Sequence, residues 1–590
     1  MTFVENECYN AEGSKNSLEY EDIKGGVINM KRKLALIISL VLAISLVLAG
    51  CGGNDNSGTG NNTSGTSTNP AMTRDGSDTL IVGMSEVKGD FIPVYYSTTY
   101  DGYVVDAVYD SLLTNDEEGN PIPHVAKEWE MSEDNKTYTF HLRDDVKFSD
   151  GEPLTAEDIE FTYMILCDPA YDGRYTDQVS QIVGLEEYRD GNAENIEGIK
   201  VIDEHTISFT FTEALATHIW DCSFAIMPKH AFSDYTKGNI EAIKAQMQTP
   251  IGSGAFTLEK FEPKQYVEFK ANPNYFLGAP KVEKMIYKFT SAETSMSEIE
   301  KGTVDVQLAV PPKGENKEII EGTGFVNIVE YPDNGYGYMG WNLRDPRLAD
   351  KKVRQALTYG FNRQQFVDVY YQGYATVCNV PISQVSWAYT DDINEYAYDP
   401  DKAIALLEEA GWKPGADGIR EKDGMKLEFV WDTYTDSKYV ETMIPMLKAD
   451  WEKIGVKVEP NLMEFNALVE KVFDERDFDM FNMAWSLSID PDAIELFHTS
   501  QDIPSGNNSV GMRNEENDKL MEAGRKEFDE NKRAEIYHEW GKLMNEELPY
   551  MYLTQNLNWD AVNARVKNWN VSPYVNFTNR TVLLDLEIEQ

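Results

Sequence analysis

The pattern of apolar and polar residues predicts a mixed α/β chain. Short runs of β-branched and aromatic residues, several of them alternating with polar residues, predict strands around 80–84, 138–142, 206–211 and 266–269. Helix start and stop signals predict helices over 156–166, 352–359, 401–410, 436–454 and, with interruptions, 515–547. Gly411 stands where it would end the third of these helices. No repeat of fixed period is present, so a solenoid is not expected.

The beginning of the chain has the layout of an export signal. Residues 31–33 are basic, residues 34–48 form an apolar run, and the small residues Ala49 and Gly50 precede Cys51. The apolar run is shorter than the roughly 20 residues that a spanning helix needs. This pattern resembles a lipoprotein signal peptide over 30–50, which implies cleavage before Cys51 and attachment of lipid to its thiol.

Residues 1–29 do not fit this layout, because a signal peptide should open with its charged region. We interpret them as an N-terminal extension produced by a mis-assigned start, since Lys24-Gly25-Gly26 can be encoded as a ribosome-binding site a few codons before Met30. A genuine cytoplasmic extension is the alternative. After Cys51, residues 54–77 are mostly Gly, Ser, Thr and Asn, so 51–77 is expected to be a lipidated, flexible tether.

Composition narrows the function classes. The chain has 590 residues, 42% of them hydrophobic, which is enough for more than one domain. It carries 100 acidic residues against 53 Lys and Arg, so it would repel a phosphate backbone, and nucleic acid is excluded as a partner. Cys167, Cys222 and Cys378 are widely spaced, without any Cys-x-x-Cys pair. They are expected to be buried thiols, with one disulfide as the alternative.

A series of ordered motifs identifies a family resemblance. Residues 146–158 read VKFSDGEPLTAED, in which Asp150-Gly151 is a tight turn, Thr155 a helix N-cap and Asp158 its capping-box partner. The other motifs, in chain order, are YDSLL (109–113), GNPIP (119–123), AKEW (126–129), PIGSGAF (250–256), NPNYF (272–276), GTVD (302–305), VRQAL (353–357), YDP (398–400), DPD (490–492) and LPY (548–550). Over nearly all of residues 78–575 the chain resembles the family 5 bacterial extracellular solute-binding proteins, which bind peptides, nickel and similar solutes.

This resemblance implies a two-lobed, periplasmic-binding-protein-like α/β fold of the class II type, with a hinge and a ligand cleft between the lobes. By analogy, lobe I should comprise 78–309 and the return segment 560–590, and lobe II should comprise 310–559. The breaker-rich segments 311–314 and 332–335 bracket the expected first crossover. The expected function is that of a monomeric, membrane-anchored, extracytoplasmic substrate-binding protein. It would need no cofactor and would deliver peptides or peptide-like solutes to the permease of an ABC importer.

The resemblance also suggests ligand-binding residues. In peptide-binding relatives the ligand adds as a strand to short segments of both lobes, and these segments correspond here to Ser97-Thr98-Thr99 and to Trp485-Ser486-Leu487. Trp485 is either a ligand anchor or a residue of the lobe core.

One position departs from the family pattern. Relatives that bind free peptides carry an Asp three positions after this Trp, which pairs with the ligand's terminal ammonium, whereas this chain has Ser488. Asp490 is either a substitute for that carboxylate or the cap of a helix over 491–497. Ligands with a free N-terminus are therefore in doubt.

Other function classes have weaker support. The seven histidines show no metal-binding spacing, no Walker loop or Gly-x-Ser-x-Gly motif occurs, and Gly252-Ser253-Gly254 fits a turn before a strand, so the chain is not expected to be an enzyme. Binding of nickel, another metal chelate or haem is the main alternative, with His498 near Asp490 and Asp492 as its first ligand to consider. Sensing of a peptide signal is a third possibility.

Overall fold

The computed structural model describes residues 2–3, 78–291, 294–435, 437–503 and 506–589. The predicted signal peptide, Cys51 and the tether lie outside the described residues. Everything described belongs to one compact unit. Its strands form a large mixed sheet, in which ten strands follow the order β20-β19-β21-β14-β22-β12-β2-β11-β10-β9, and four smaller sheets.

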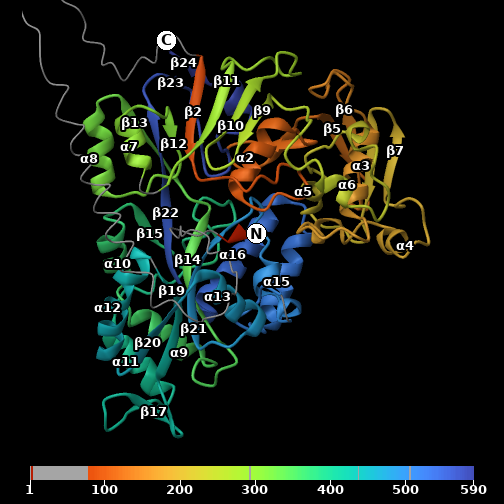
Figure 1. Cartoon of the computed structure of the whole chain (residues 1–590). Coiled ribbons are helices and arrows are strands. Elements are labelled where there is room, and N and C mark those ends of the chain that lie inside the picture. The colour runs from red at the N-terminus through yellow and green to blue at the C-terminus, as the bar shows by residue number, and fades with distance from the viewer. Residues whose placement is uncertain (1, 4–77, 292–293, 436, 504–505, 590) are drawn as a thin grey trace, which may run out of the picture. The chain divides into compact units, whose positions relative to one another are not determined.

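Lobe I is built on the β12-to-β9 half of the large sheet (Figure 1). Its strands are β2 (Thr79–Met84), β9 (Phe256–Glu262), β10 (Tyr266–Ala271), β11 (Lys284–Phe289) and β12 (Val306–Gln307). Strand β2 runs parallel to both β11 and β12. Helices α2 (Thr99–Val108) and α17 (Arg580–Asp585) contribute Val104, Val105 and Leu583 to the apolar core of this half. The core therefore joins the beginning of the described body to its C-terminal end.

A four-stranded antiparallel sheet forms a second layer within lobe I. Its order is β5 (Ala126–Met131), β6 (Thr137–Leu142), β8 (Thr206–Thr210) and β7 (Ile199–Asp203). Phe140, Ile207 and Phe209 of these strands pack with Ile159 and Tyr163 of α3 (Ala156–Leu166) in one apolar cluster. The alternation of buried and partly exposed residues along β6 is the pattern from which that strand was predicted.

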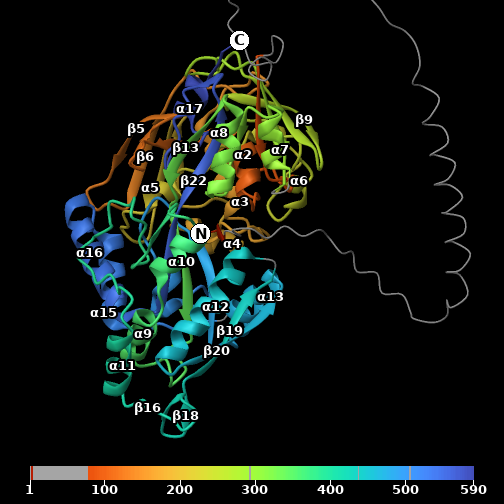
Figure 2. The same cartoon turned by 90° about the vertical axis from the view of Figure 1, so that its left-hand side faces the viewer.

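Lobe II is built on the other half of the large sheet. Its strands are β14 (Gly335–Trp341), β19 (Glu428–Tyr434), β20 (Lys457–Met463) and β21 (Met480–Ser486). The surrounding helices are α9 (Lys351–Tyr359), α10 (Arg363–Tyr370), α11 (Pro400–Glu409), α12 (Lys438–Lys453), α15 (Glu515–Lys526) and α16 (Glu530–Glu547), as Figure 2 shows. The largest apolar cluster, which includes Trp341, Trp431, Trp451 and Trp540, lies here.

One long strand belongs to both halves. The C-terminal part of β22 (Tyr550–Asn563) pairs with β12 and with β13 (Val326–Pro332). Its N-terminal part pairs with β14 and, at residues 554–556, with β15 (Ala375–Val377). The chain crosses between the halves at the β13–β14 turn, where Asp333 N donates to Asn556 O at 3.0 Å. The lobe boundaries at 309/310 and 559/560 stay predictions. The pairing of Asp333 with Asn556 favours positions near these two residues for the two crossings of the chain between the lobes.

The shorter elements connect these layers. They are β1 (Thr2–Phe3), β3 (Leu113–Asn115), β4 (Pro121–Pro123), α4 (Leu185–Arg189), α5 (His218–Asp221), α6 (Glu241–Lys244), α7 (Ser295–Glu300), α8 (Gly314–Thr323), β16 (Lys413–Pro414), β17 (Arg420–Lys422), β18 (Met425–Lys426), α13 (Phe465–Val469), α14 (Ile494–Phe497), β23 (Val566–Lys567) and β24 (Glu587–Ile588). None of the helices among the described residues is both long enough and apolar enough to span a bilayer.

The predicted strands at β2, β6, β8 and β10 and the predicted helices at α3, α9, α11 and α12 are confirmed within two residues at either end. The interruption expected within 515–547 lies at 527–529, where Asp529 caps α16 by accepting from Lys532 N. The capping box of α3 is confirmed, because Thr155 N donates to Asp158 Oδ2 at 2.9 Å. The Asp150-Gly151 turn is confirmed as well, with Gly151 at φ +98°.

The helix start predicted at Pro491 is wrong. The helix near Asp490 begins at Ile494 rather than at Pro491, and Asp490 does not cap it. Asp492 accepts from Ile494 N at 3.1 Å instead. The Asp-Pro pair that suggested a cap lies in the loop before the helix.

A buried ion pair fastens the C-terminal segment to lobe I. Asp110, at the end of α2, accepts from Arg580 Nε at 2.7 Å, from Tyr275 OH at 3.0 Å and from Ser253 Oγ at 3.0 Å, and His124 Nε2 lies 2.9 Å from it. Burial opposes the ionised form, but Arg580 and then His124 hold the pKa of Asp110 below its usual range. Gly252 and Gly254 beside Ser253 approach the backbone of Val108 so closely that a Cβ atom would clash. The Gly-Ser-Gly segment is therefore a structural turn, as expected.

This ion pair gives a first prediction. Arg580→Leu should lower the free energy of unfolding by roughly 3–5 kcal/mol, because it leaves the Asp110 carboxylate buried without its cation. Lys281→Met is the matched control. Lys281 also binds the C-terminal segment, through an ion pair with Glu587 at 2.5 Å, but both side chains of that pair are half exposed to solvent. Its effect should be much smaller. Urea denaturation of both variants measures the difference, and equal losses would contradict the assignment.

The same pair should make stability depend on pH. Because the folded-state pKa of Asp110 is depressed, its contribution is present above the unfolded-state pKa of about 4 and is lost as the pH falls below it. The wild type should therefore lose more stability than Arg580→Leu between neutral pH and acid.

Candidate ligand-binding site

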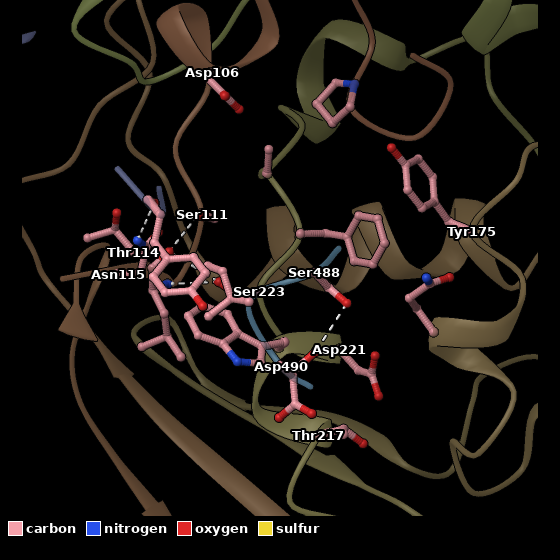
Figure 3. A pocket seen from close by; sticks show the side chains of 18 of the residues that line it. Asp106, Ser111, Thr114, Asn115, Tyr175, Thr217, Asp221, Ser223, Ser488 and Asp490 are labelled. Atoms are coloured by element: carbon pink, nitrogen blue, oxygen red, sulfur yellow. Dashed lines mark hydrogen bonds between the residues drawn. The ribbon is translucent and has the colours of Figure 1, made fainter. Parts of the chain in front are cut away.

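A cavity of about 670 Å³ lies where residues of both lobes meet. Lobe I contributes Asp106 of α2, Asp221 of α5 and Tyr175, and lobe II contributes Ser488 and Asp490. Figure 3 shows Asp490 and Asp221 near one end of the cavity and Asp106 at the other. The lobes also touch directly beside it, because Ala216 N donates to Arg525 O at 2.7 Å. The volume is that of a site for a small to medium-sized ligand.

Two acidic groups of the lobe II wall, Asp490 and Asp492, are already paired. Asp490 makes a two-pronged ion pair with Arg533, with Nη1 to Oδ2 at 2.7 Å and Nη2 to Oδ1 at 2.8 Å. Asp492 lies 3.0 Å from Arg525 Nε. Burial raises the pKa of Asp492 to about 6, with Arg525 opposing the rise and Asp490 adding to it. Neither carboxylate is a free anchor for a ligand ammonium.

The lobe I wall carries carboxylates that are bonded to neutral or titratable groups. Asp221 Oδ2 lies 2.9 Å from His218 Nδ1, and Asp106 accepts from Thr578 Oγ1 at 3.0 Å. Burial raises the pKa of both carboxyl groups. For Asp221 the hydrogen bond from His218 opposes the rise, and the charge of Asp490 across the cavity adds to it. Arg525 of lobe II also lowers the pKa of Asp221, and by more than Asp490 raises it, so the charges of lobe II do not simply repel this carboxylate.

The structure brings only part of the predicted site to this cavity. Ser488 and Asp490 line it. Ser97, Thr98 and Thr99 do not line the cavity. Thr98 is the N-cap of α2, and its backbone C=O accepts from Gly102 N. The segment is therefore the start of a helix rather than a strand. Whether these three residues contact a ligand stays a prediction.

The segment at Trp485 lies on β21. Trp485 is 2% exposed, stacks at 6.1 Å on Tyr338 and lines a separate cavity of about 30 Å³ with Tyr336 and Tyr439. Leu487 N donates to Asn334 O, and Leu487 O accepts from Asn334 Nδ2. Ser486 pairs with Gly335 of β14. The aromatic ring is part of the lobe II core, and the role of this segment in ligand binding stays a prediction.

The free edge of β21 accepts an extended backbone. Strand β19 pairs with β21 only at Met480 and Phe481, which leaves the following residues open on that side. There, β1 pairs with β21 in antiparallel register, with Thr2 opposite Ser486 and Phe3 opposite Trp485. An edge that pairs with a two-residue segment of the same chain has the geometry for strand addition.

Analysis of the sequence missed Asp106, Asp221 and Arg525. A signal exists for Asp106, because it is the one acid in the otherwise apolar run 103–108. Asp221 and Arg525 lie in segments rich in polar residues, and nothing in their spacing marks them. Their positions at the cavity depend on how the two lobes meet.

No metal site is found among the described residues, in which no group of three or more His, Cys, Asp and Glu side chains is placed to hold an ion. His498 does not face Asp490 and Asp492. Its Nδ1 lies 2.7 Å from Ser500 Oγ, and its Nε2 lies 3.3 Å from Glu522 Oε1. The three cysteines Cys167, Cys222 and Cys378 are buried, free thiols, as expected, and burial raises the pKa of Cys378 to about 11.

Comparison with known proteins identifies the family. Residues 120–504 match the model of the bacterial extracellular solute-binding proteins, family 5, and the chain belongs to this family. It is 30% identical to the oligopeptide-binding protein AppA of Bacillus subtilis (strain 168) over 92% of this chain and 97% of that protein.

Solved structures agree on the two-lobed fold. The structure of Bacillus subtilis AppA in complex with a nonapeptide matches 87% of this chain and 99% of its own, at 28% identity and a TM-score of 0.71. The structure of NikZ from Campylobacter jejuni in complex with Ni(L-His) matches 87% of this chain and 99% of its own, at 25% identity and a TM-score of 0.72. The protein is therefore a solute-binding protein with a two-lobed α/β fold.

Proposed function

We propose that this protein captures peptides or peptide-like solutes in the cavity between its lobes and delivers them to the permease of an ABC importer. The observation that carries the proposal is the 670 Å³ cavity with polar residues from both lobes on its walls. A ligand that contacts both walls stabilises the arrangement in which the lobes meet, which is how a hinged binding protein responds to its solute. The function is binding rather than catalysis.

Two observations favour a peptide over other solutes. The relative with 30% identity is an oligopeptide-binding protein, and its solved structure holds a nonapeptide. The edge of β21 at Trp485 and Ser486, which β1 occupies in this structure, would offer its backbone groups to an extended ligand in a mature protein that begins at Cys51. Main-chain pairing of this kind recognises peptides with little dependence on their sequence. We therefore keep Ser97, Thr98, Thr99, Trp485, Ser486, Leu487, Ser488 and Asp490 as proposed ligand-binding residues.

Ser488 and Asp490 should not anchor a terminal ammonium. The Ser488 hydroxyl donates to Asp490 O at 3.3 Å, and the Asp490 carboxylate is held by Arg533. A neutral hydroxyl is a weaker partner for an ammonium than a free carboxylate. The protein should consequently bind free and N-acetylated peptides with similar affinity.

The proposal includes location. We propose that the mature protein begins at lipid-modified Cys51, is joined by the 51–77 tether to the outer face of the cell membrane, and acts as a monomer. Residues 30–50 supply the signal sequence for this processing. A lipid group with two or more chains gives firm anchoring.

The main alternative is capture of a metal chelate, because NikZ in complex with Ni(L-His) has the same fold. No arrangement of His498 with Asp490 or Asp492 supports it. Haem binding and peptide-signal sensing are further alternatives, because one fold can serve several functions. Identification of the bound ligand would distinguish them.

The second prediction tests capture directly. Calorimetry with matched tripeptides, free and N-acetylated, should give binding to both forms with affinities within about tenfold, since Asp490 and Asp492 are already paired with Arg533 and Arg525 and neither is free for the ammonium. A preference above about a hundredfold for the free amine, lost in Asp490→Asn, would show that Asp490 binds the ammonium after all. Binding of Ni(L-His) or haemin without binding of any peptide would replace the proposed function by the alternative.

The third prediction concerns the anchor. Intact mass of protein extracted from membranes should correspond to a chain that starts at Cys51 with attached lipid. Cys51→Ala should leave the membrane fraction, whereas Cys378→Ala, which removes a buried thiol, should stay there. Recovery of Cys51→Ala from membranes at the wild-type level would contradict lipidation.

A further inference from the structure

Asp106 is a half-buried carboxylate that forms no ion pair among the described residues. It lies on α2, and Figure 3 shows its side chain extending into the cavity. The charge of Arg580 favours the ionised form of Asp106, but the hydrogen bonds of Arg580 run to Asp110, to Tyr109 O and to Thr578 O. Thr578 and Asn576 hydrogen-bond the Asp106 carboxylate, and these neutral groups compensate its charge only in part.

The charges on the cavity wall compensate this carboxylate only through Arg580, which forms no ion pair with it. The acidic residues that line the cavity are Asp106, Asp221, Asp490, Asp492 and Glu495, and the arginines are Arg525 and Arg580. Asp490 and Asp492 are paired with Arg533 and Arg525, and Asp221 is bonded to His218. Acidic groups therefore outnumber the arginines in the lining of the cleft, and Asp106 is one of those that form no ion pair.

The surroundings of Asp106 suit a cation. Tyr96, Tyr109 and Tyr175 also line the cavity, and burial together with the charge of Asp106 raises the pKa of Tyr96. The Tyr109 hydroxyl is buried, at 1% residue exposure. An oxygen acceptor beside aromatic faces is the combination that binds ammonium and guanidinium groups.

The chain itself shows that these rings accept a guanidinium. Arg174 lies over Tyr96 at 5.1 Å and over Tyr175 at 4.8 Å. Its N–H groups donate to Ser97 O and to Tyr175 OH, and none of them is bonded to Asp106. The carboxylate therefore stays available to the ligand.

We infer that Asp106 binds a positively charged side chain of the ligand, so that the cleft selects peptides that carry Lys or Arg. This inference rests on the proposed function and adds its substrate class. The peptide backbone would still be recognised without regard to sequence, and selectivity would come from this one position.

Two blocked peptides test the inference. N-acetylated, C-amidated Ala-Lys-Ala and Ala-norleucine-Ala differ in one cationic group, so their affinity ratio measures recognition of the side-chain charge. The wild type should bind the Lys peptide about 10- to 100-fold more tightly, as expected for a charge-assisted hydrogen bond. Asp106→Asn should bring the two affinities within about threefold, because an amide keeps the shape and loses the charge.

Two controls separate this effect from loss of structure. Glu133→Gln makes the same change of charge at an exposed position of lobe I that does not line the cavity, and it should keep the preference. The thermal unfolding temperature of ligand-free Asp106→Asn should equal or exceed that of the wild type, because burial disfavours the ionised carboxylate.

Three results would overturn the inference while the proposed function stands. They are equal binding of the two peptides by the wild type, an unchanged preference in Asp106→Asn, and loss of the preference in Asp221→Asn alone. If the wild type binds neither of these peptides nor any other, the proposed function fails and the inference fails with it.

Discussion

The strand β22 is the constraint on which the rest of the structure depends. Its 14 residues are hydrogen-bonded to β12 and β13 at one end and to β14 and β15 at the other, so a single strand belongs to both halves of the large sheet. The chain enters lobe II at the β13–β14 turn and returns along β22. Asp333 binds β22 there through Asn556 O and, at 2.8 Å, through Gln555 Nε2. Two adjacent crossings of this kind form a hinge, and they leave the cavity walls free to approach each other.

Buried charged side chains complete the frame around this hinge. Asp305 fixes β12 to β2 through Ile81 N at 2.8 Å and to the end of β22 through Arg565 at 2.8 Å, and the Asp110–Arg580 pair secures the C-terminal segment. In lobe II, Arg363 donates to the backbone of Cys378 and Tyr552. Asp110 and Asp305 belong to the family motifs YDSLL and GTVD, and the roles of all these residues are structural. Asp106 in the cleft differs from them, because it forms no ion pair among the described residues.

The sequence predicted the fold far better than the site. Capping signals and alternation are local, and they located α3, with its Thr155–Asp158 box, and β6 correctly. The Asp490-Pro491 pair has the same local appearance as a helix cap, yet the carboxylate bonds Arg533, which lies on α16. Asp106, Asp221 and Arg525 come together only because the two lobes meet. The meeting of the lobes depends on long-range packing, which no local pattern encodes. The order of the family motifs could therefore predict two lobes but not the chemistry of the cleft.

The central claim is that a peptide is enclosed by closure of two lobes about β22. Small-angle scattering of ligand-depleted protein, before and after saturation with a peptide shown to bind, tests it most directly. The radius of gyration should be smaller with peptide, because the ligand adds contacts to both walls only when they approach. An unchanged radius at saturation, with removal of copurified ligand verified by native mass spectrometry, would contradict it.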